Sequence, residues 1–306
     1  QRFIATVPAG FGTDLELLVN IDGQFNDPAG TTSLPYFFSY NAPLVLGANK
    51  VPTSGGRLIV QGRDLGPINV PGAVTSVKVR LWSNNLNPGQ ILECLNPVVT
   101  VANTEVECDL PEGSGASLDV QVTTGGQASN FETVFSFEAP VIENVRPVRA
   151  QVGQTVTVSG RNFGNNERDL QFRFNGVVVN SNFFNITVNH TELQFVVPMG
   201  TGAAIPLAMR LPVFVDSGLV TQDNIPVIPA PNNSITFNYA KPVVFRVTPA
   251  GTQGGTVTVV GDNFGPLGGA FLDGVRIGSV LCTTPVVTVA NTQLECALQA
   301  GARPAL

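Results

Sequence analysis

Short stretches of alternating polar and apolar residues recur along the chain. Residues 155–158 and 256–259 both read TVTV, and residues 57–60 read RLIV. A period of two places alternate side chains on opposite faces of a β-strand, so each stretch predicts a half-buried strand. Glycine (32) and proline (23) are plentiful between such runs, as expected of turns. No stretch of ten or more residues has an apolar period of 3.6, so almost no helix is expected.

Three sequence signals repeat in the same order. The first is Gly-x-(Asn/Asp)-(Phe/Leu)-Gly at residues 62–66, 160–164 and 261–265. The second is a near copy, CLNPVVTVANTEVEC at 94–108 and CTTPVVTVANTQLEC at 282–296. The third is an aromatic strand that ends in proline, at 37–43, 135–140 and 237–242. These prolines are 97 and 102 residues apart, which is the size of one β-sandwich domain.

The Gly-x-Asn-Phe-Gly stretch follows each alternating strand directly. Its two glycines suit positions with φ above zero, and its aromatic residue is placed to fill one end of a sandwich. We interpret it as a turn with a buried anchor and assign it no chemistry.

These residues resemble the IPT/TIG family, the immunoglobulin-like fold of plexin-type receptors and some transcription factors. The T-V-x-V-x-G-x-N-F-G stretch, the cysteine pair and the closing residues 125–130 (GGQASN) match in order, and the resemblance covers essentially the whole chain. The first repeat departs with Asp64-Leu65, and the second lacks the cysteine pair and has extra residues around 216–233. The resemblance implies an all-β protein of tandem immunoglobulin-like β-sandwiches with almost no helix.

The repeats are out of phase with the chain. Two full domains are expected at residues 41–140 and 141–240. Residues 1–40 match the closing part of a domain, and residues 241–306 match the opening part. Either the chain is a portion of a longer array, or the first 40 residues of one subunit complete the last domain of its neighbour by donor-strand complementation. The predicted inter-subunit strands are 15–19 and 36–40, with the contacting residues Leu15, Leu17, Val19, Phe37, Phe38 and Tyr40.

About 15 positions of the repeat are present both at the start and at the end of the sequence. Donor-strand complementation would require only one copy of them.

The four cysteines form two pairs with identical spacing. The repeat places Cys94 with Cys108 and Cys282 with Cys296 on neighbouring segments of one sandwich. Metal binding would need four ligands, and neither pair has a histidine or a second pair nearby. Two local disulfides are therefore predicted, and they indicate an oxidising compartment.

Three Asn-x-Ser/Thr sequons lie in the second domain, at Asn185, Asn189 and Asn232. In a secreted eukaryotic protein each would accept an N-linked glycan; otherwise they are unmodified surface residues. Asn185 and Asn189 are four residues apart, which on a strand places both on one face. Glycans there would cover an exposed strand face.

The net charge of the chain argues against some classes of binding partner. The net charge is −6 with 16 basic residues and no basic cluster, which argues against nucleic acid and anionic membranes. No run of about 18 apolar residues occurs, so no membrane span is expected in this sequence. The chain starts at Gln1 without a signal peptide, so we interpret it as a mature or truncated product.

No catalytic, cofactor or metal site is predicted. The only histidine, His190, lies inside a sequon, and the carboxylates are scattered at positions typical of turns. Trp82, the only tryptophan, is interpreted as a core or interface aromatic, with a sugar-stacking role as the alternative.

The favoured function is a structural extracellular protein that assembles with copies of itself into a fibril. The alternative is a cell-surface receptor or adhesin ectodomain that binds other surface proteins or glycans. An accessory module of a secreted carbohydrate-active enzyme is a third hypothesis. The acidic balance and paired cysteines argue against a transcription factor.

Overall fold

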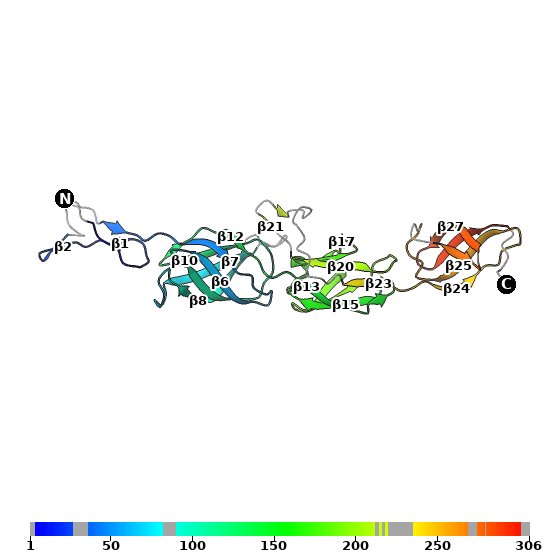
Figure 1. Ribbon diagram of the computed structural model, residues 1–306, viewed down its shortest axis with the longest axis horizontal. Coiled ribbons are helices and arrows are strands. Elements are labelled where there is room, and N and C mark those ends of the chain that lie inside the picture. Colours follow the sequence, from blue (N-terminus) through cyan, green and yellow to red (C-terminus); the bar gives the residue numbers. More distant parts are fainter. Residues whose placement is uncertain are drawn as a thin grey trace. The chain divides into compact units, whose positions relative to one another are not determined.

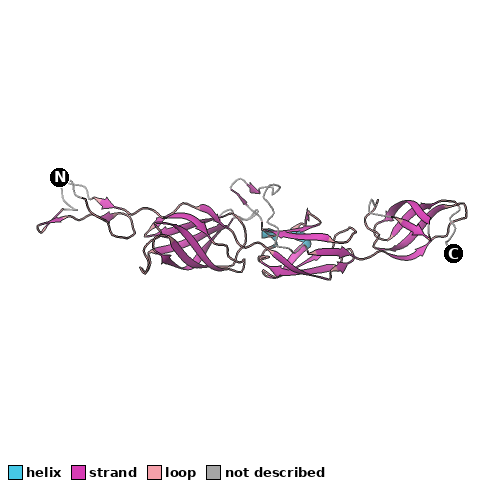
Figure 2. Ribbon diagram, viewed as in Figure 1, coloured by secondary structure: helices cyan, strands magenta, loops and turns pink. Residues whose placement is uncertain are grey.

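The computed structural model describes residues 4–26, 36–81, 90–211, 214–215, 218–219, 235–268, 274–278 and 280–300. Nearly all regular structure in these residues is β-strand (Figure 2). Two short 3₁₀ helices, η1 (Glu167–Asp169) and η2 (Ser181–Phe183), are the helical elements of this part. The all-β prediction is thus confirmed. No helix among the described residues has the length and apolar character needed to cross a bilayer.

The first 40 residues contain two small antiparallel pairs. Strand β1 (Leu15–Glu16) pairs with β4 (Phe37–Phe38), and β2 (Asn20–Ile21) pairs with β3 (Gln24–Phe25). The sequence predicted one strand over 15–19, whereas the structure has a strand only at its first two residues. A strand without a neighbour on its other side has few partners for its backbone groups, which accounts for the shorter element.

Residues 44–135 form one eight-stranded sheet that folds over a shared core (Figure 1). Its order is β11-β10-β7-β8-β9-β6-β5, and β12 also pairs with β10. The long strand β8 pairs with both β7 and β9, so it joins the two layers. The strands are β5 (Leu44–Ala48), β6 (Gly56–Arg63), β7 (Val74–Leu81), β8 (Gln90–Val101), β9 (Glu105–Leu110), β10 (Leu118–Thr124), β11 (Gln127–Ala128) and β12 (Glu132–Phe135).

Residues 141–239 form two sheets, β13-β15-β19-β18 and β14-β23-β20-β16-β17. Their buried aromatic residues include Phe172, Phe174, Phe195 and Phe237, whose rings contact one another. The strands are β13 (Val141–Arg146), β14 (Arg149–Ala150), β15 (Thr155–Arg161), β16 (Gln171–Phe174), β17 (Val177–Val178), β18 (Phe184–Val188), β19 (Glu192–Val196), β20 (Ile205–Arg210) and β23 (Thr236–Tyr239). A separate hairpin joins β21 (Phe214–Val215) to β22 (Gly218–Leu219).

Residues 243–298 form a single five-stranded sheet, β24-β25-β28-β27-β26. Its buried cluster holds Val257, Val259, Phe264, Val287, Leu294 and the two cysteines. The strands are β24 (Val243–Val247), β25 (Gly255–Asp262), β26 (Val275–Ile277), β27 (Val280–Val289) and β28 (Gln293–Leu298).

The Gly-x-Asn-Phe-Gly turn buries its anchor in every repeat, at Leu65, Phe163 and Phe264. The expectation that both glycines have positive φ is wrong for the first one. In each five-residue motif, the third residue and the last glycine take positive φ, as with Asn263 (φ 63) and Gly265 (φ 91). The first glycine is required for space, because a Cβ on Gly261 would lie 2.0 Å from the Val243 carbonyl oxygen.

Candidate functional site

The described residues within 8–40, 111–138 and 198–240 share one arrangement, which we call the closing half. In each, the first strand pairs antiparallel with the last at the same position. The pairs are Leu15 with Phe38, Leu118 with Phe135 and Ile205 with Phe237. The described residues at this end of the chain therefore share their strand pairing with the last strands of the 41–140 and 141–240 domains.

The loop before the first strand of each closing half is also the same. A backbone N–H of the last strand donates to a glycine carbonyl of this loop. The bonds run from Tyr40 to Gly12 (3.0 Å), from Phe137 to Gly115 (3.1 Å) and from Tyr239 to Gly202 (3.0 Å). Two residues later the backbone turns through positive φ, at Asp14 (54°), Ser117 (55°) and Ala204 (55°). Such agreement shows that the loop forms from local sequence in all three places.

A tyrosine ties the last strand to the loop in two closing halves. The Tyr40 hydroxyl donates to the Pro8 carbonyl (2.9 Å), and the Tyr239 hydroxyl donates to the Pro198 carbonyl (3.1 Å). Burial raises the pKa of Tyr239 to about 12, because desolvation disfavours the phenolate. Phe137 takes this place in the other closing half, without a hydroxyl. Sequence reasoning missed this contact, although the aromatic residue at a fixed distance before proline was its visible signal.

The three closing halves differ in what covers their inner face. Val120 is completely buried in the 41–140 domain, whereas its counterpart Leu17 is 49% exposed. Leu15 and Val19 are likewise exposed, whereas their counterparts Leu118 and Val122 are buried. Among the other predicted inter-subunit residues, Phe37 is exposed, whereas Phe38 and Tyr40 are half-buried and their rings contact each other.

The sheet of residues 243–298 also has exposed apolar residues on its first strand. Val45 on β5 is 2% exposed, whereas Val244, at the same place on β24, is 57% exposed. Each lies opposite the first glycine of its turn motif, Gly62 or Gly261. In the 41–140 domain the cluster around Val45 includes side chains of the closing half, Phe135 and Phe137 among them. The buried cluster of residues 243–298 includes no such side chains.

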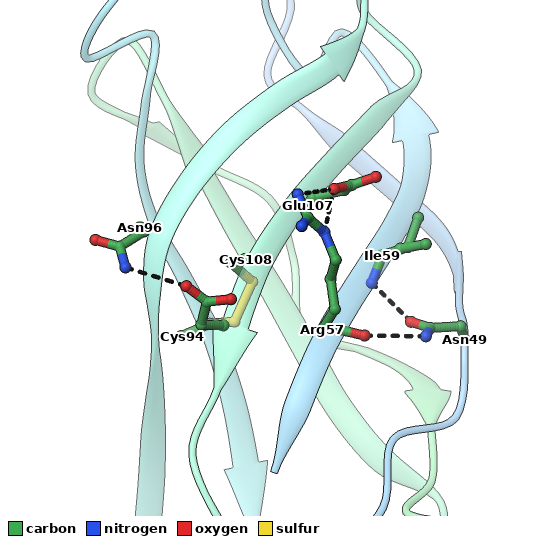
Figure 3. Close-up of a disulfide and its surroundings, with 8 residues drawn as sticks. Asn49, Arg57, Ile59, Cys94, Asn96, Glu107 and Cys108 are labelled. Carbon is green, nitrogen blue, oxygen red and sulfur yellow. Dashed lines mark hydrogen bonds and ion pairs between the residues drawn. A yellow bond between two sulfur atoms is a disulfide. The ribbon is translucent and has the colours of Figure 1, made fainter.

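Both cysteine pairs form disulfides. Cys94 joins Cys108, and Cys282 joins Cys296, each with 5.7 Å between Cα atoms. Figure 3 shows the first bond between neighbouring strands. Near it, the Asn96 side-chain amide donates to a carboxylate oxygen of Asp109 at 3.1 Å. The disulfides tie β8 to β9 and β27 to β28, and they are consistent with an extracellular or surface location.

The 141–240 domain has phenylalanines where the other two have cystines. Phe195 lies opposite Val156, as Cys108 lies opposite Leu58 and Cys296 opposite Val257. Its cross-strand partner is the buried Phe184. Aromatic packing thus replaces the covalent link in this domain.

The sequons Asn185 and Asn189 are both exposed. Asn185 lies on β18, the edge strand of its sheet. Asn189 lies in the turn after β18, so the expectation that both project from one strand face is wrong, because the chain reverses at His190 (φ 65). Asn232 and Trp82 lie outside the described residues.

The described carboxylates do not gather into a metal site. The most buried of them is Asp119, whose Oδ2 accepts from Nη2 of Arg80 at 2.6 Å. The Arg80 guanidinium also lies 4.3 Å from the centre of the Phe131 ring. This pair links β7 to the closing half and is structural.

A groove lies beside β17 in the 141–240 domain. Its lining is mostly apolar and includes Val177, Phe183, Met199 and Tyr239. Charged side chains are absent from this lining, so the groove offers packing surface rather than chemistry.

Three comparisons place the chain among known proteins. Residues 140–226 match the family model of the IPT/TIG domain. The search of curated proteins finds no match.

Among similar solved structures is the surface glycan-binding protein PbSGBP-B from Prevotella bryantii. It has 15% identity over 56% of this chain and 40% of that chain, with a TM-score of 0.34. A second is SGBP-B from a complex xyloglucan utilization locus in Bacteroides uniformis (13% identity, 84% of this chain, 86% of that chain, TM-score 0.24). A third is the surface layer protein SbsC, domains 1–6 (13% identity, 86% of this chain, 51% of that chain, TM-score 0.23). Scores this low carry no functional argument.

The described strands and their pairing define a protein of tandem immunoglobulin-like β-sandwiches. Within it, residues 140–226 match the IPT/TIG domain, the family that the repeated motifs resemble.

Proposed function

We propose that this chain is a structural extracellular protein that assembles head to tail with copies of itself. The closing half at residues 8–40 of one copy completes the open sandwich at residues 243–298 of the next. A contact between two different surfaces repeats from copy to copy, so it produces a filament unless the rotation closes a ring.

One observation carries the proposal. The chain holds a preformed closing half whose inner face is exposed at Leu15, Leu17 and Val19. It also holds an opening half whose first strand is exposed from Val243 to Val247. Exposed apolar surfaces of this kind mark interaction sites, and the two complete domains display how such halves fit together.

The disulfides and the exposed sequons Asn185 and Asn189 support an extracellular setting, with N-linked glycans on the edge strand β18 and its turn. Glycans there would limit sideways pairing of strand edges and leave the end-to-end contact free. The arrangement calls for no cofactor and favours a role without catalysis.

Electron microscopy of the native material, with denaturing mass analysis after glycan removal, tests the proposal. We expect filaments that dissociate on denaturation into single chains, each much shorter than the filament. Monodisperse short rods, or filaments that persist as much longer single polypeptides, would support the alternative of a receptor or adhesin ectodomain.

A further inference from the structure

The two complete domains specify how the halves pair, and this inference rests on the proposed function. The position that pairs with the closing half comes after the first strand of each domain, at Val51, Ala150 and Ala250. The same tight turn follows it in all three places. Its hydrogen bonds run from Gly55 N to Pro52 O (3.0 Å), from Gln154 N to Gln151 O (3.2 Å) and from Gly254 N to Gly251 O (2.9 Å). The three residues are therefore structural counterparts.

In both complete domains this position pairs in parallel with the aromatic residue of the last strand. Val51 lies opposite Phe137, and Ala150 lies opposite Tyr239. The next residue of the last strand donates its N–H to the same carbonyl, from Glu138 to Val51 (2.9 Å) and from Ala240 to Ala150 (2.9 Å). Ala250 is exposed, and among the described residues no backbone N–H donates to its carbonyl.

The residue types identify which closing half fits residue 250. In the 141–240 domain a small alanine lies opposite a tyrosine whose hydroxyl binds a proline carbonyl. Tyr40 makes the same hydroxyl contact with a proline carbonyl, and Ala250 is the counterpart of Ala150. We infer that Tyr40 of one copy pairs in parallel with Ala250 of the next copy, and that the Asn41 N–H donates to the Ala250 carbonyl.

Leu17, which follows the first strand of the closing half, defines a second pair of residues across the inferred contact. In the 41–140 domain Val120 lies opposite Val79, and Val79 also lies opposite Leu92. Ile277 is the counterpart of Val79, since it lies opposite Val280 in the same position relative to the disulfide. Leu17 is the counterpart of Val120. Leu17 therefore pairs antiparallel with Ile277 of the next copy.

Position 250 sets the specificity of this contact because it faces the aromatic residue. Valine is accommodated there, as Val51 shows, whereas a tryptophan would occupy the space of the Tyr40 ring. Ala250 is exposed in the free chain, so substitutions there leave its own fold intact.

Cysteine crosslinking tests the register. A Leu17→Cys chain is mixed with an Ile277→Cys chain under oxidising conditions, after the native disulfides have formed. Cross-strand neighbours in this geometry have Cβ atoms about 4.5–5.5 Å apart, which a disulfide tolerates with small adjustment. We expect a species of twice the chain mass on a non-reducing gel. The matched control, Leu18→Cys with Ile277→Cys, places the thiols on opposite faces and should give at least tenfold less product.

The outcomes separate the register from the function. Chains that assemble but crosslink through Leu18→Cys, or not at all, overturn the register and leave the proposed function standing. A parent chain that never assembles overturns both. In the same assay A250V should assemble as the parent does and A250W should lose assembly; equal assembly by the two variants also overturns the inferred contact.

Discussion

The 41–140 domain and residues 243–298 begin alike and end differently. Val45 and Val244 occupy the same place on the first strand and face the same glycine of the turn motif. Val45 is buried and Val244 is exposed. In the 41–140 domain the cluster around Val45 includes the closing-half residues Phe135 and Phe137, whereas the cluster described for residues 243–298 includes no such side chains. Burial in this fold is therefore decided by strands about 70–90 positions further along the repeat, and local hydrophobicity does not determine it.

The largest contrast is expected for the aromatic residue of the last strand. Phe135→Ala removes a buried ring that packs edge-on against Phe137 at 5.0 Å, and it should destabilise the 41–140 domain by about 3–5 kcal/mol. Phe38→Ala, at the matched position, should cost less than about 1 kcal/mol in the unassembled chain. Urea denaturation, analysed domain by domain, measures both. Equal losses would contradict the comparison.

The two disulfides provide the next contrast. Both close loops with a sequence separation of 14, so each should contribute roughly 3 kcal/mol in the chain-entropy model. Replacing Cys94 and Cys108 with serine should leave the 41–140 domain folded at a lower Tm. Replacing Cys282 and Cys296 should unfold the smaller cluster of residues 243–298 in the free chain.

Calorimetry with and without a thiol reductant measures these transitions. The 141–240 domain is the internal control, because Phe184 and Phe195 replace the cystine and its transition should not move. A reductant-sensitive transition in that domain would contradict the assignment.

A smaller effect is expected at the first strand. Val45→Ala removes two buried methyl groups, which at about 0.8 kcal/mol each with a residual cavity gives ~2 kcal/mol. Val244→Ala should change the unfolding of the free chain by less than about 0.5 kcal/mol, yet weaken assembly. Denaturation curves and sedimentation velocity on the same samples separate the two effects. A stability loss at residue 244 as large as at residue 45 would show that Val244 is already covered in the free chain.

The smallest effect concerns a surface ion pair that only the first domain has. Arg57 pairs with Glu107, and the arginine side chain is 63% exposed. The counterpart of Arg57 in residues 243–298 is Thr256, opposite Ala297, and the counterpart of Glu107 is Glu295, opposite Thr258. Arg57→Ala should cost, and Thr256→Arg should gain, less than about 1 kcal/mol, with both effects reduced by salt. Thermal unfolding at low and high ionic strength measures them, and changes that do not respond to salt would indicate lost packing.

The sequence was sufficient for the features that are local or repeated. The alternating runs at 57–60, 155–158 and 256–259 lie on β6, β15 and β25, and the equal cysteine spacing identified both disulfides. Correspondence with the closing part of the repeat predicted that Leu15, Leu17 and Val19 contact a neighbouring subunit, and the structure shows that all three are exposed.

Features that depend on distant pairing could not be read from the sequence. The crossing of β8 between layers, the Arg80–Asp119 pair and the parallel contact of Val51 with Phe137 join residues that are far apart in the chain. The strand expected over 15–19 is another example. Only Leu15–Glu16 is strand, because a strand persists only where neighbouring strands pair with it.

The most direct test mixes two variants of the whole chain, each disabled at one end. Leu17→Asp with Phe38→Asp disables the closing half, and Val244→Asp with Ala250→Arg disables the open sandwich. The account predicts that each variant alone is monomeric in sedimentation equilibrium. It predicts that the mixture forms a capped species of two chains and nothing longer. Oligomers from either variant alone, or a mixture that stays monomeric, would contradict strand exchange between copies.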